Sequence, residues 1–191
     1  STSTAASHSF PGGTCVLTYA PLDVDAIIRS VGDDGAGATA VFIGTTRDSF
    51  KGKVVVKLEY QAYSKLAIKT MTEIIQAAQV GASAAGRSPS SHAPLPPPPP
   101  PPPSTSPSAL TASASPPPPP SLLLHTILHH RLGPVPVGQP SIVIAVSSPH
   151  RREAFAACEE ILEQVKMRAQ IWKREYYEGE AAEAAEWKAN V

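Results

Sequence analysis

Residues 141–168 read SIVIAVSSPHRREAFAACEEILEQVKMR, and this stretch decides the fold. It begins with a run of apolar, largely β-branched side chains, which is typical of a buried strand. A helix is expected to follow, because Ser148 suits its N-cap and Pro149 its first turn. Apolar residues then recur at helical spacing, so that one stripe of the helix is expected to pack on a sheet. The stripe consists of Ala154, Phe155, Cys158, Ile161, Leu162 and Val165.

Shorter elements lie on the N-terminal side of this strand and helix. Further strands are predicted at 15–18, 38–43, 54–60 and 122–128, and further helices at 24–31 and 65–79. A turn-rich segment, 133–138, separates the last two strands. The resulting order is β-α-β-β-α followed by β-β-α, without strict alternation. This order predicts an α+β fold with a mixed, largely antiparallel sheet and flanking helices.

Two segments have compositions that do not favour a packed core. Residues 1–14 are small and polar, and we expect them to form a disordered tail. Residues 81–121 are rich in Ala and Ser and then in Pro, and consecutive prolines can join neither a helix nor a central strand. We therefore expect a disordered, low-complexity insertion within a single domain made of residues 15–80 and 122–191.

The overall composition excludes several classes of protein. Sixteen basic residues balance sixteen acidic ones, so no global field favours nucleic acid or a membrane surface. No apolar run approaches the roughly 20 residues that span a bilayer. The two cysteines, Cys15 and Cys158, are too few for a disulfide scaffold, and their spacing is not that of a zinc site. We expect a cytosolic protein without a metal, in which Cys158 is an inert apolar residue of its helix.

Several basic residues are candidates for chemistry. His150 and Arg151 lie at the start of the long helix, where free N–H groups and the helix dipole favour an anion. Arg47 lies in a loop after a strand, a position suited to recognition. The alternatives are a solvated helix end for the first pair and a local ion pair with Asp48 for Arg47. The residues alone leave both alternatives open.

A second basic cluster lies between residues 166 and 175. Its cations are interleaved with Met167, Ile171 and Trp172, which indicates that the segment packs against other residues. A lysine beside an apolar wall can lose part of its proton affinity and act as an acid, base or nucleophile. The alternative is a solvated charged face, which is the commoner outcome for a charge run. The cluster consists of Lys166, Arg168, Lys173 and Arg174.

The length of the helix separates the two basic regions. His150 and Lys166 are sixteen residues apart, which is about 24 Å along a continuous helix. One chain therefore does not bring both residues to one small substrate. Either there are two sites, or a symmetric dimer places the helix start of one subunit near the lysine of the other.

Four motifs occur in an order that is more specific than any one of them. They are G-x-x-R-D at 44–48, H-R-L-G at 130–133, S-x-H-R-x-x-A-F at 148–155 and K-x-x-x-x-x-W-K-x-E at 166–175. With the sequence around them, over 35–63, 130–138 and 141–175, the chain resembles the large subunit of molybdopterin synthase. That family's α/β hammerhead-like fold is consistent with the α+β prediction above.

The resemblance implies a sulfurtransferase that converts cyclic pyranopterin monophosphate to molybdopterin. The implied sulfur donor is the C-terminal thiocarboxylate of a small, ubiquitin-like subunit, in a heterotetramer built on a homodimer of large subunits. No cofactor is implied, because the sulfur arrives on the partner. Carried over residue by residue, the implied catalytic residues are Lys166 and Lys173, and the implied substrate-binding residues are Arg47, His150, Arg151, Arg174 and Glu175. The family usually has a proline where this chain has Gln170.

A competing hypothesis is an interaction protein that recruits a partner through its Pro-rich segment. A polyproline II segment can bind an SH3 or WW-like domain, although many linkers share this propensity. Deleting residues 82–121 separates the two hypotheses. The enzyme keeps its sulfur transfer, whereas the interaction protein loses its partner.

Overall fold

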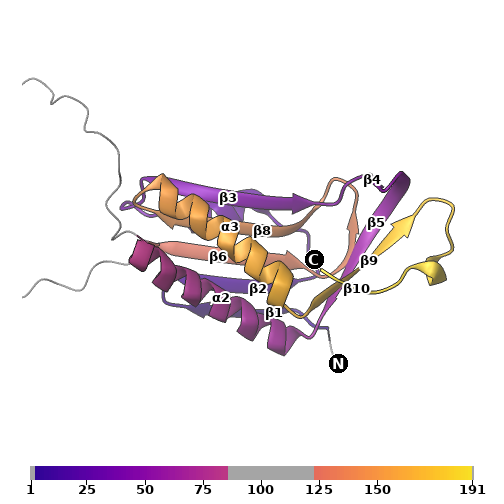
Figure 1. Cartoon of the computed structure of the whole chain (residues 1–191), viewed down its shortest axis with the longest axis horizontal. Helices are drawn as coiled ribbons and strands as arrows, with labels where there is room; N and C mark the ends of the chain where they lie inside the picture. The colour runs from indigo at the N-terminus through magenta and orange to yellow at the C-terminus, as the bar shows by residue number, and fades with distance from the viewer. Residues whose placement is uncertain (1–2, 86–122, 191) are drawn as a thin grey trace, which may run out of the picture.

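The computed structural model describes residues 3–85 and 123–190, and there the chain forms two sheets with helices packed on the larger one (Figure 1). The larger sheet has five strands. In spatial order they are β1 (Ala6–Phe10), β2 (Gly13–Thr18), β6 (His125–Arg131), β8 (Pro140–Ser148) and β3 (Ala38–Thr45). Strands β2 and β6 are parallel, and the other three pairings in this sheet are antiparallel. The predicted α+β class, with a mixed and largely antiparallel sheet, is confirmed.

The second sheet is antiparallel throughout and is built around one long strand. Its strands, in spatial order, are β10 (Lys188–Ala189), β9 (Ile171–Tyr177), β5 (Lys53–Ala62) and β4 (Ser49–Phe50), and β7 (Gly133–Pro136) also pairs with β5. Figure 1 shows this sheet crossing one end of the first, near the C-terminal ends of α3 and β6. Segments from both halves of the chain therefore meet at this junction.

The helices cover both faces of the five-stranded sheet. They are α1 (Val24–Ser30), α2 (Ser64–Ala85) and α3 (Arg151–Arg168), and a short 3-10 turn, η1, covers Ala182–Ala184. Helices α2 and α3 lie side by side on one face (Figure 1), where they enclose the main core. A smaller core lies on the opposite face, beneath α1. None of the described helices is both long and apolar enough to cross a membrane.

Strand β8 explains why residues 141–148 form an unbroken buried run. Ile142 and Ile144 belong to the main core, whereas Val143 and Ala145 belong to the core under α1. Because successive side chains point to opposite faces, a strand covered on both sides needs apolar residues throughout. The predicted strand and the helix after it are both confirmed, with His150 at the N-cap instead of Ser148.

The expectation of a disordered tail over residues 1–14 is wrong for most of that segment. Ala6–Phe10 forms β1 and pairs with β2, and the backbone N–H of Thr4 donates to Ser64 Oγ at 2.9 Å. The outer edge of β2 offers backbone donors and acceptors that any side-chain composition can satisfy. Phe10, which packs against the main core, is the one large apolar side chain among these residues.

Other boundaries also differ from the sequence-based expectation. Helix α2 runs on to Ala85 instead of ending at Gln79, and the turn-rich segment 133–138 contains strand β7. Phe155, placed on the apolar stripe of α3, is 66% exposed. Of the predicted insertion at 81–121, residues 81–85 belong to α2. The remainder, from residue 86 onward, lies outside the described residues.

Candidate functional site

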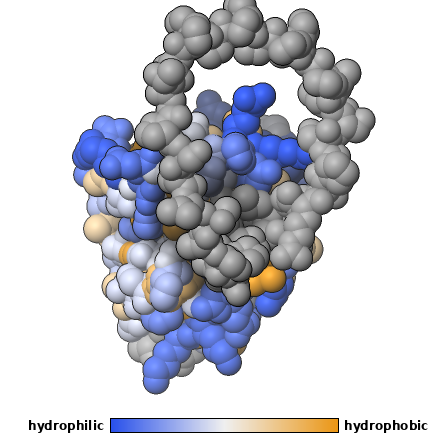
Figure 2. All heavy atoms as spheres, turned by 90° about the vertical axis from the view of Figure 1, so that its left-hand side faces the viewer, coloured by the Kyte–Doolittle hydropathy of each residue, from blue (hydrophilic) through white to orange (hydrophobic). Residues whose placement is uncertain are grey.

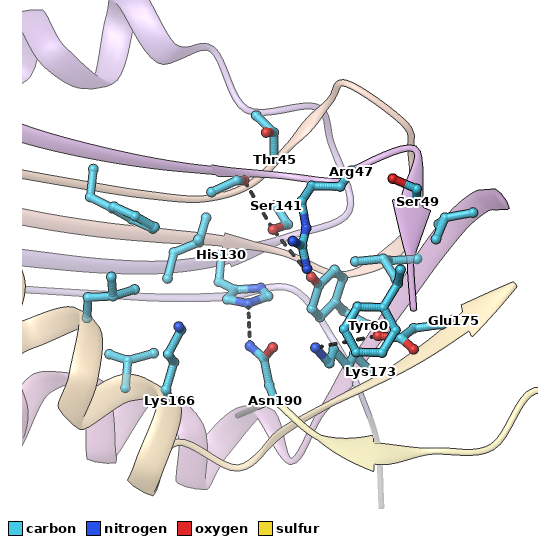
Figure 3. A pocket seen from close by; sticks show the side chains of 18 residues that line it. Thr45, Arg47, Ser49, Tyr60, His130, Ser141, Lys166, Lys173, Glu175 and Asn190 are labelled. Carbon is cyan, nitrogen blue, oxygen red and sulfur yellow. Dashed lines mark hydrogen bonds and ion pairs between the residues drawn. The ribbon is translucent and has the colours of Figure 1, made fainter. Parts of the chain in front are cut away.

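A pocket of about 190 Å³ lies where the second sheet meets the first sheet and the C-terminal half of α3 (Figure 3). Its walls come from segments that are far apart in the sequence. Four charged side chains line it, and three of them are cationic, which leaves a formal excess of two positive charges. They are Arg47, Lys166, Lys173 and Glu175. The pocket is therefore suited to an anionic ligand.

The two lysines reach the pocket from consecutive elements. Lys166 lies in the last turn of α3, and Lys173 lies on β9, which begins after the turn at Ala169 and Gln170. Gln170 stabilises this turn, because its side chain donates to the Arg168 carbonyl at 2.8 Å and accepts from Thr70 Oγ1 at 3.0 Å. The reversal of the chain there places both lysines on one pocket.

Along β9, side chains alternate between the pocket and the opposite face. Lys173 and Glu175, two residues apart, line the pocket, and Lys173 Nζ lies 3.7 Å from Glu175 Oε1. Glu175 is also 3.8 Å from Lys188 Nζ and accepts a 2.5 Å hydrogen bond from Tyr177 Oη. This bond to the carboxylate, together with partial desolvation, raises the pKa of Tyr177 to about 12. Glu175 therefore holds several groups of β9 and β10 together at the edge of the pocket.

Arg174 does not line this pocket, and the role in substrate binding that the resemblance implies for it stays a prediction. Its Nη2 lies 2.9 Å from Glu59 Oε2, and its guanidinium lies 4.7 Å from the Trp187 ring centroid. Desolvation alone raises the pKa of Glu59, but hydrogen bonds from Tyr176 and Arg174 outweigh it, so that the pKa is lowered. In this structure Arg174 links β9 to β5.

Arg47 points into the pocket from the loop between β3 and β4 (Figure 3). The preceding residue, Thr46, is buried, and its backbone N–H donates to the Gln139 carbonyl at 3.1 Å. The Thr46 carbonyl accepts from the Gly138 N–H at 2.9 Å, which anchors the loop on the turn before β8. Arg47 lies 5.8 Å from the Phe50 ring centroid. This anchored loop positions its guanidinium.

His150 and Arg151 are not brought to this pocket. Both are exposed at the other end of α3, and the helix from Arg151 to Arg168 is continuous. Figure 2 views the molecule from that side and shows mostly hydrophilic residues on the coloured surface. The separation of about 24 Å from Lys166 that the sequence predicts is therefore present within one chain.

Several polar side chains of the pocket carried no clear signal in the sequence. Tyr60 lies on β5 and Ser141 on β8, and their hydroxyl oxygens are 3.4 Å apart. His130 on β6 is fully buried, and its ring packs edge-to-face on Tyr60 at 4.9 Å. Asn190, next to β10, completes the wall. In the sequence, His130 stood out only as the first residue of the H-R-L-G motif, without a role of its own.

The two cysteines are poor candidates for carrying sulfur. Both are buried free thiols, and burial raises the pKa of Cys15 to about 12 and that of Cys158 to about 11. The reactive thiolate form is therefore disfavoured. Among the described residues there is also no cluster of three or more His, Cys, Asp or Glu side chains arranged to hold a metal ion.

The fold and the pocket define a two-sheet α+β protein with a cationic cavity at the sheet junction. A family model described as MoaE protein matches residues 17–86 and 119–168. The chain belongs to the MoaE protein family, which confirms the resemblance found in the sequence.

Curated relatives support the same assignment. The chain is 38% identical over 174 residues to a Drosophila willistoni protein named molybdopterin synthase catalytic subunit, covering 91% of this chain and 36% of that protein. It is 36% identical over 174 residues to a Culex quinquefasciatus protein of the same name, covering 91% of this chain and 86% of that protein. The chain thus spans about a third of the length of the Drosophila relatives and most of the Culex relative.

Solved structures share the fold. Molybdopterin synthase from Staphylococcus aureus superposes with a TM-score of 0.62 at 24% identity, covering 90% of this chain and 94% of that chain. A complex of subunits 1 and 2 of the molybdopterin-converting factor from Helicobacter pylori matches with a TM-score of 0.54 at 17% identity, covering 87% of this chain and 86% of that chain. These similarities support the fold seen in Figure 1.

Proposed function

We propose that this chain is the catalytic subunit of a molybdopterin synthase, which transfers sulfur to cyclic pyranopterin monophosphate to form molybdopterin. The observation that carries the proposal is the convergence of Lys166 and Lys173 on one pocket, in a chain of this family. The pocket is cationic, and both the substrate phosphate and a thiocarboxylate donor are anions. Charge complementarity therefore favours the binding of both reactants in this pocket.

The sulfur donor in this proposal is the C-terminal thiocarboxylate of a small, ubiquitin-like subunit. A partner is needed because both cysteines of this chain are buried with raised pKa values, so no described side chain is suited to donate sulfur. A narrow pocket of about 190 Å³ suits the end of an extended tail better than a folded surface. The Helicobacter pylori structure that shares this fold is a complex of subunits 1 and 2 of the molybdopterin-converting factor, which supports a two-subunit assembly.

The two lysines take complementary roles in this mechanism. The Lys166 ammonium stabilises negative charge on the reacting sulfur and oxygen atoms and moves protons to and from them. Lys173 is held by Glu175 at 3.7 Å, so its position is fixed before the reactants arrive. Arg47, on its anchored loop, binds an anionic group of the substrate.

His150 and Arg151 contribute to substrate binding from a second copy of the chain. Within one chain the continuous α3 keeps them about 24 Å from Lys166. A two-fold dimer of large subunits removes this separation, because the helix start of one copy meets the pocket of the other. With one small subunit per pocket the assembly is a heterotetramer. We place it in the cytosol, where free thiols such as Cys15 and Cys158 persist.

Single-turnover sulfur transfer tests the proposal. The assay contains the thiocarboxylated small subunit, cyclic pyranopterin monophosphate and either the unaltered chain or the Lys166→Ala variant. We expect the variant to form molybdopterin at least roughly 100-fold more slowly, because a positioned proton-transfer group is lost. Lys69→Ala is the matched control, since Lys69 is an exposed lysine of α2 that pairs only loosely with Glu73. Undiminished product formation by Lys166→Ala contradicts the assignment.

A further inference from the structure

The side chain of His130 is a fully buried imidazole in the wall of a cationic pocket, and the mechanism above does not use it. His130 is the second-last residue of β6, and its ring packs against the ring of Tyr60. Buried polar groups are costly unless they are hydrogen-bonded, so both ring nitrogens need partners. The partner of each nitrogen determines what the ring offers to a ligand.

The hydrogen bond of Nδ1 fixes the tautomer. Nδ1 lies 2.8 Å from the backbone carbonyl oxygen of Arg131, and a carbonyl oxygen only accepts. Nδ1 therefore carries the hydrogen. Burial lowers the pKa of His130 to about 4, so the ring is neutral at ordinary pH. It follows that Nε2 carries a lone pair and acts as a hydrogen-bond acceptor.

Nε2 faces the pocket, and an N–H donor already reaches it there. Asn190 Nδ2 lies 3.3 Å from His130 Nε2, as the dashed line in Figure 3 shows. Asn190 follows β10, a strand of only two residues, and one further backbone bond ties it to β9, from the Asn190 N–H to the Ile171 carbonyl at 3.3 Å. This short attachment makes Asn190 easier to displace than a residue within a long strand. The acceptor is thus available to a ligand that supplies its own N–H group.

A neutral acceptor has a distinct use among the charged groups of this pocket. Arg47, Lys166 and Lys173 only donate hydrogen bonds, so they recognise phosphate and thiocarboxylate but not N–H groups. The Glu175 carboxylate is already held by Lys173 and other neighbours. The aminopyrimidinone ring of a pterin, in contrast, carries N–H donors. His130 Nε2 matches that end of the substrate without adding charge.

We propose that His130 Nε2 binds an N–H group of the aminopyrimidinone ring of the substrate, displacing Asn190, and so selects pterins that carry this donor. The inference rests on the proposed function, since it names the part of the pterin substrate that this wall receives. A ligand that displaces Asn190 but lacks the donor leaves the buried nitrogen unpaired, which weakens binding roughly 10- to 100-fold.

Two substitutions separate the acceptor from the structural hydrogen bond. In His130→Asn the amide nitrogen lies near the position of Nδ1 and keeps the bond to the Arg131 carbonyl, but nothing replaces Nε2. In His130→Gln the amide oxygen lies near the position of Nε2 and keeps the acceptor. We expect KM for cyclic pyranopterin monophosphate to rise at least roughly 10-fold in His130→Asn and to stay within about 3-fold in His130→Gln, with kcat less affected in both. Equal KM values for the two variants overturn the inference.

A ligand-side measurement does not depend on how the variants fold. A pterin phosphomonoester and its derivative with all ring and amino N–H groups methylated are titrated into the unaltered protein by following pterin fluorescence. We expect the methylated ligand to bind roughly 10-fold or more weakly, and this difference to shrink in His130→Asn. Equal affinity of the two ligands for the unaltered protein overturns the inference. If the unaltered protein and its small subunit produce no molybdopterin, the proposed function fails instead, so the two failures are distinguishable.

Discussion

Neighbouring side chains on β9 have opposite surroundings. Lys173 faces the pocket beside Glu175, whereas Arg174 pairs with Glu59 on the other face. Because side chains alternate along a strand, a shift of one residue in the pairing of β5 with β9 would exchange these two cations. The pairing of β5 with β9 is irregular between Val55 and Lys57. This irregularity lies away from Tyr60, which pairs with Lys173. The register at Tyr60 therefore decides which basic residue is available for chemistry.

A buried histidine makes stability depend on pH in the acid range. The pKa of His130 is about 4 in the folded protein, below its usual 6.5, so between these values the unfolded chain binds the proton that the folded protein excludes. The stability due to the neutral ring is present above pH 6.5 and is lost as pH falls through 4, by up to about 3 kcal/mol. Urea unfolding from pH 7.5 to 4.5 should show this loss. The pH dependence should be smaller in His130→Asn, and an unchanged dependence contradicts the prediction. His8→Asn, at an exposed histidine, is the control.

At the scale of elements, the start of α3 is fixed by a contact with the segment before β3. Ala38 of β3 pairs with Ser148 of β8, and the preceding Gly37 lies against the Pro149 carbonyl just before the His150 N-cap. A glycine is required there because the chains approach so closely that no Cβ fits. This contact therefore fixes the position of the start of α3, where Arg151 lies.

Gly37→Ala should therefore destabilise the protein. A Cβ at residue 37 would lie 2.3 Å from the Pro149 carbonyl oxygen, a backbone atom that cannot rotate away. We expect a loss of about 1–3 kcal/mol in the free energy of unfolding, measured by urea denaturation. Gly81→Ala is the matched control, since a Cβ at this position of α2 meets nothing within 4 Å. That change should stabilise the helix by about 0.5–1 kcal/mol. Equal stabilities of the two variants would contradict the role of Gly37.

At the scale of the whole molecule, α3 is one continuous helix that separates the basic residues at its start from those in its last turn (Figure 1). The pocket contains Lys166 but lacks His150 and Arg151. If all three serve one substrate, the complete site requires a second copy of the chain.

Mixing inactive variants tests this shared site. The Lys166→Ala variant and a His150→Ala, Arg151→Ala double variant should each be inactive alone. After they are unfolded together and refolded, about a quarter of the normal activity should return, because half of the dimers are mixed and each mixed dimer has one intact site. Mixing Lys166→Ala with Lys173→Ala is the control, since both lesions lie in the pocket of one chain and no site is restored. A mixture with the double variant that stays inactive contradicts a site shared between subunits.

Local sequence determined the elements whose physical signal is strong. The apolar run and amphipathic stripe of 141–168 fixed β8 and α3, and the balance of strands and helices indicated the α+β class. The four ordered motifs indicated the family. Weak elements were missed because their stability comes from pairing with a neighbour and not from their own composition. Strand β1 is polar, and β7 has the sequence of a turn.

Tertiary structure alone decided which of the basic residues meet. The sequence placed Lys166, Lys173 and Arg174 in one cluster, but the direction of each side chain depends on where α3 ends and on the register of β9 against β5. His130 and Asn190 join the pocket through contacts sixty residues apart, which no local pattern encodes. The sequence by itself determined the strand, the long helix and the family, because these follow from short-range periodicity and motifs. The composition of the pocket was decided by the packing of two sheets, because only folding brings its distant segments together.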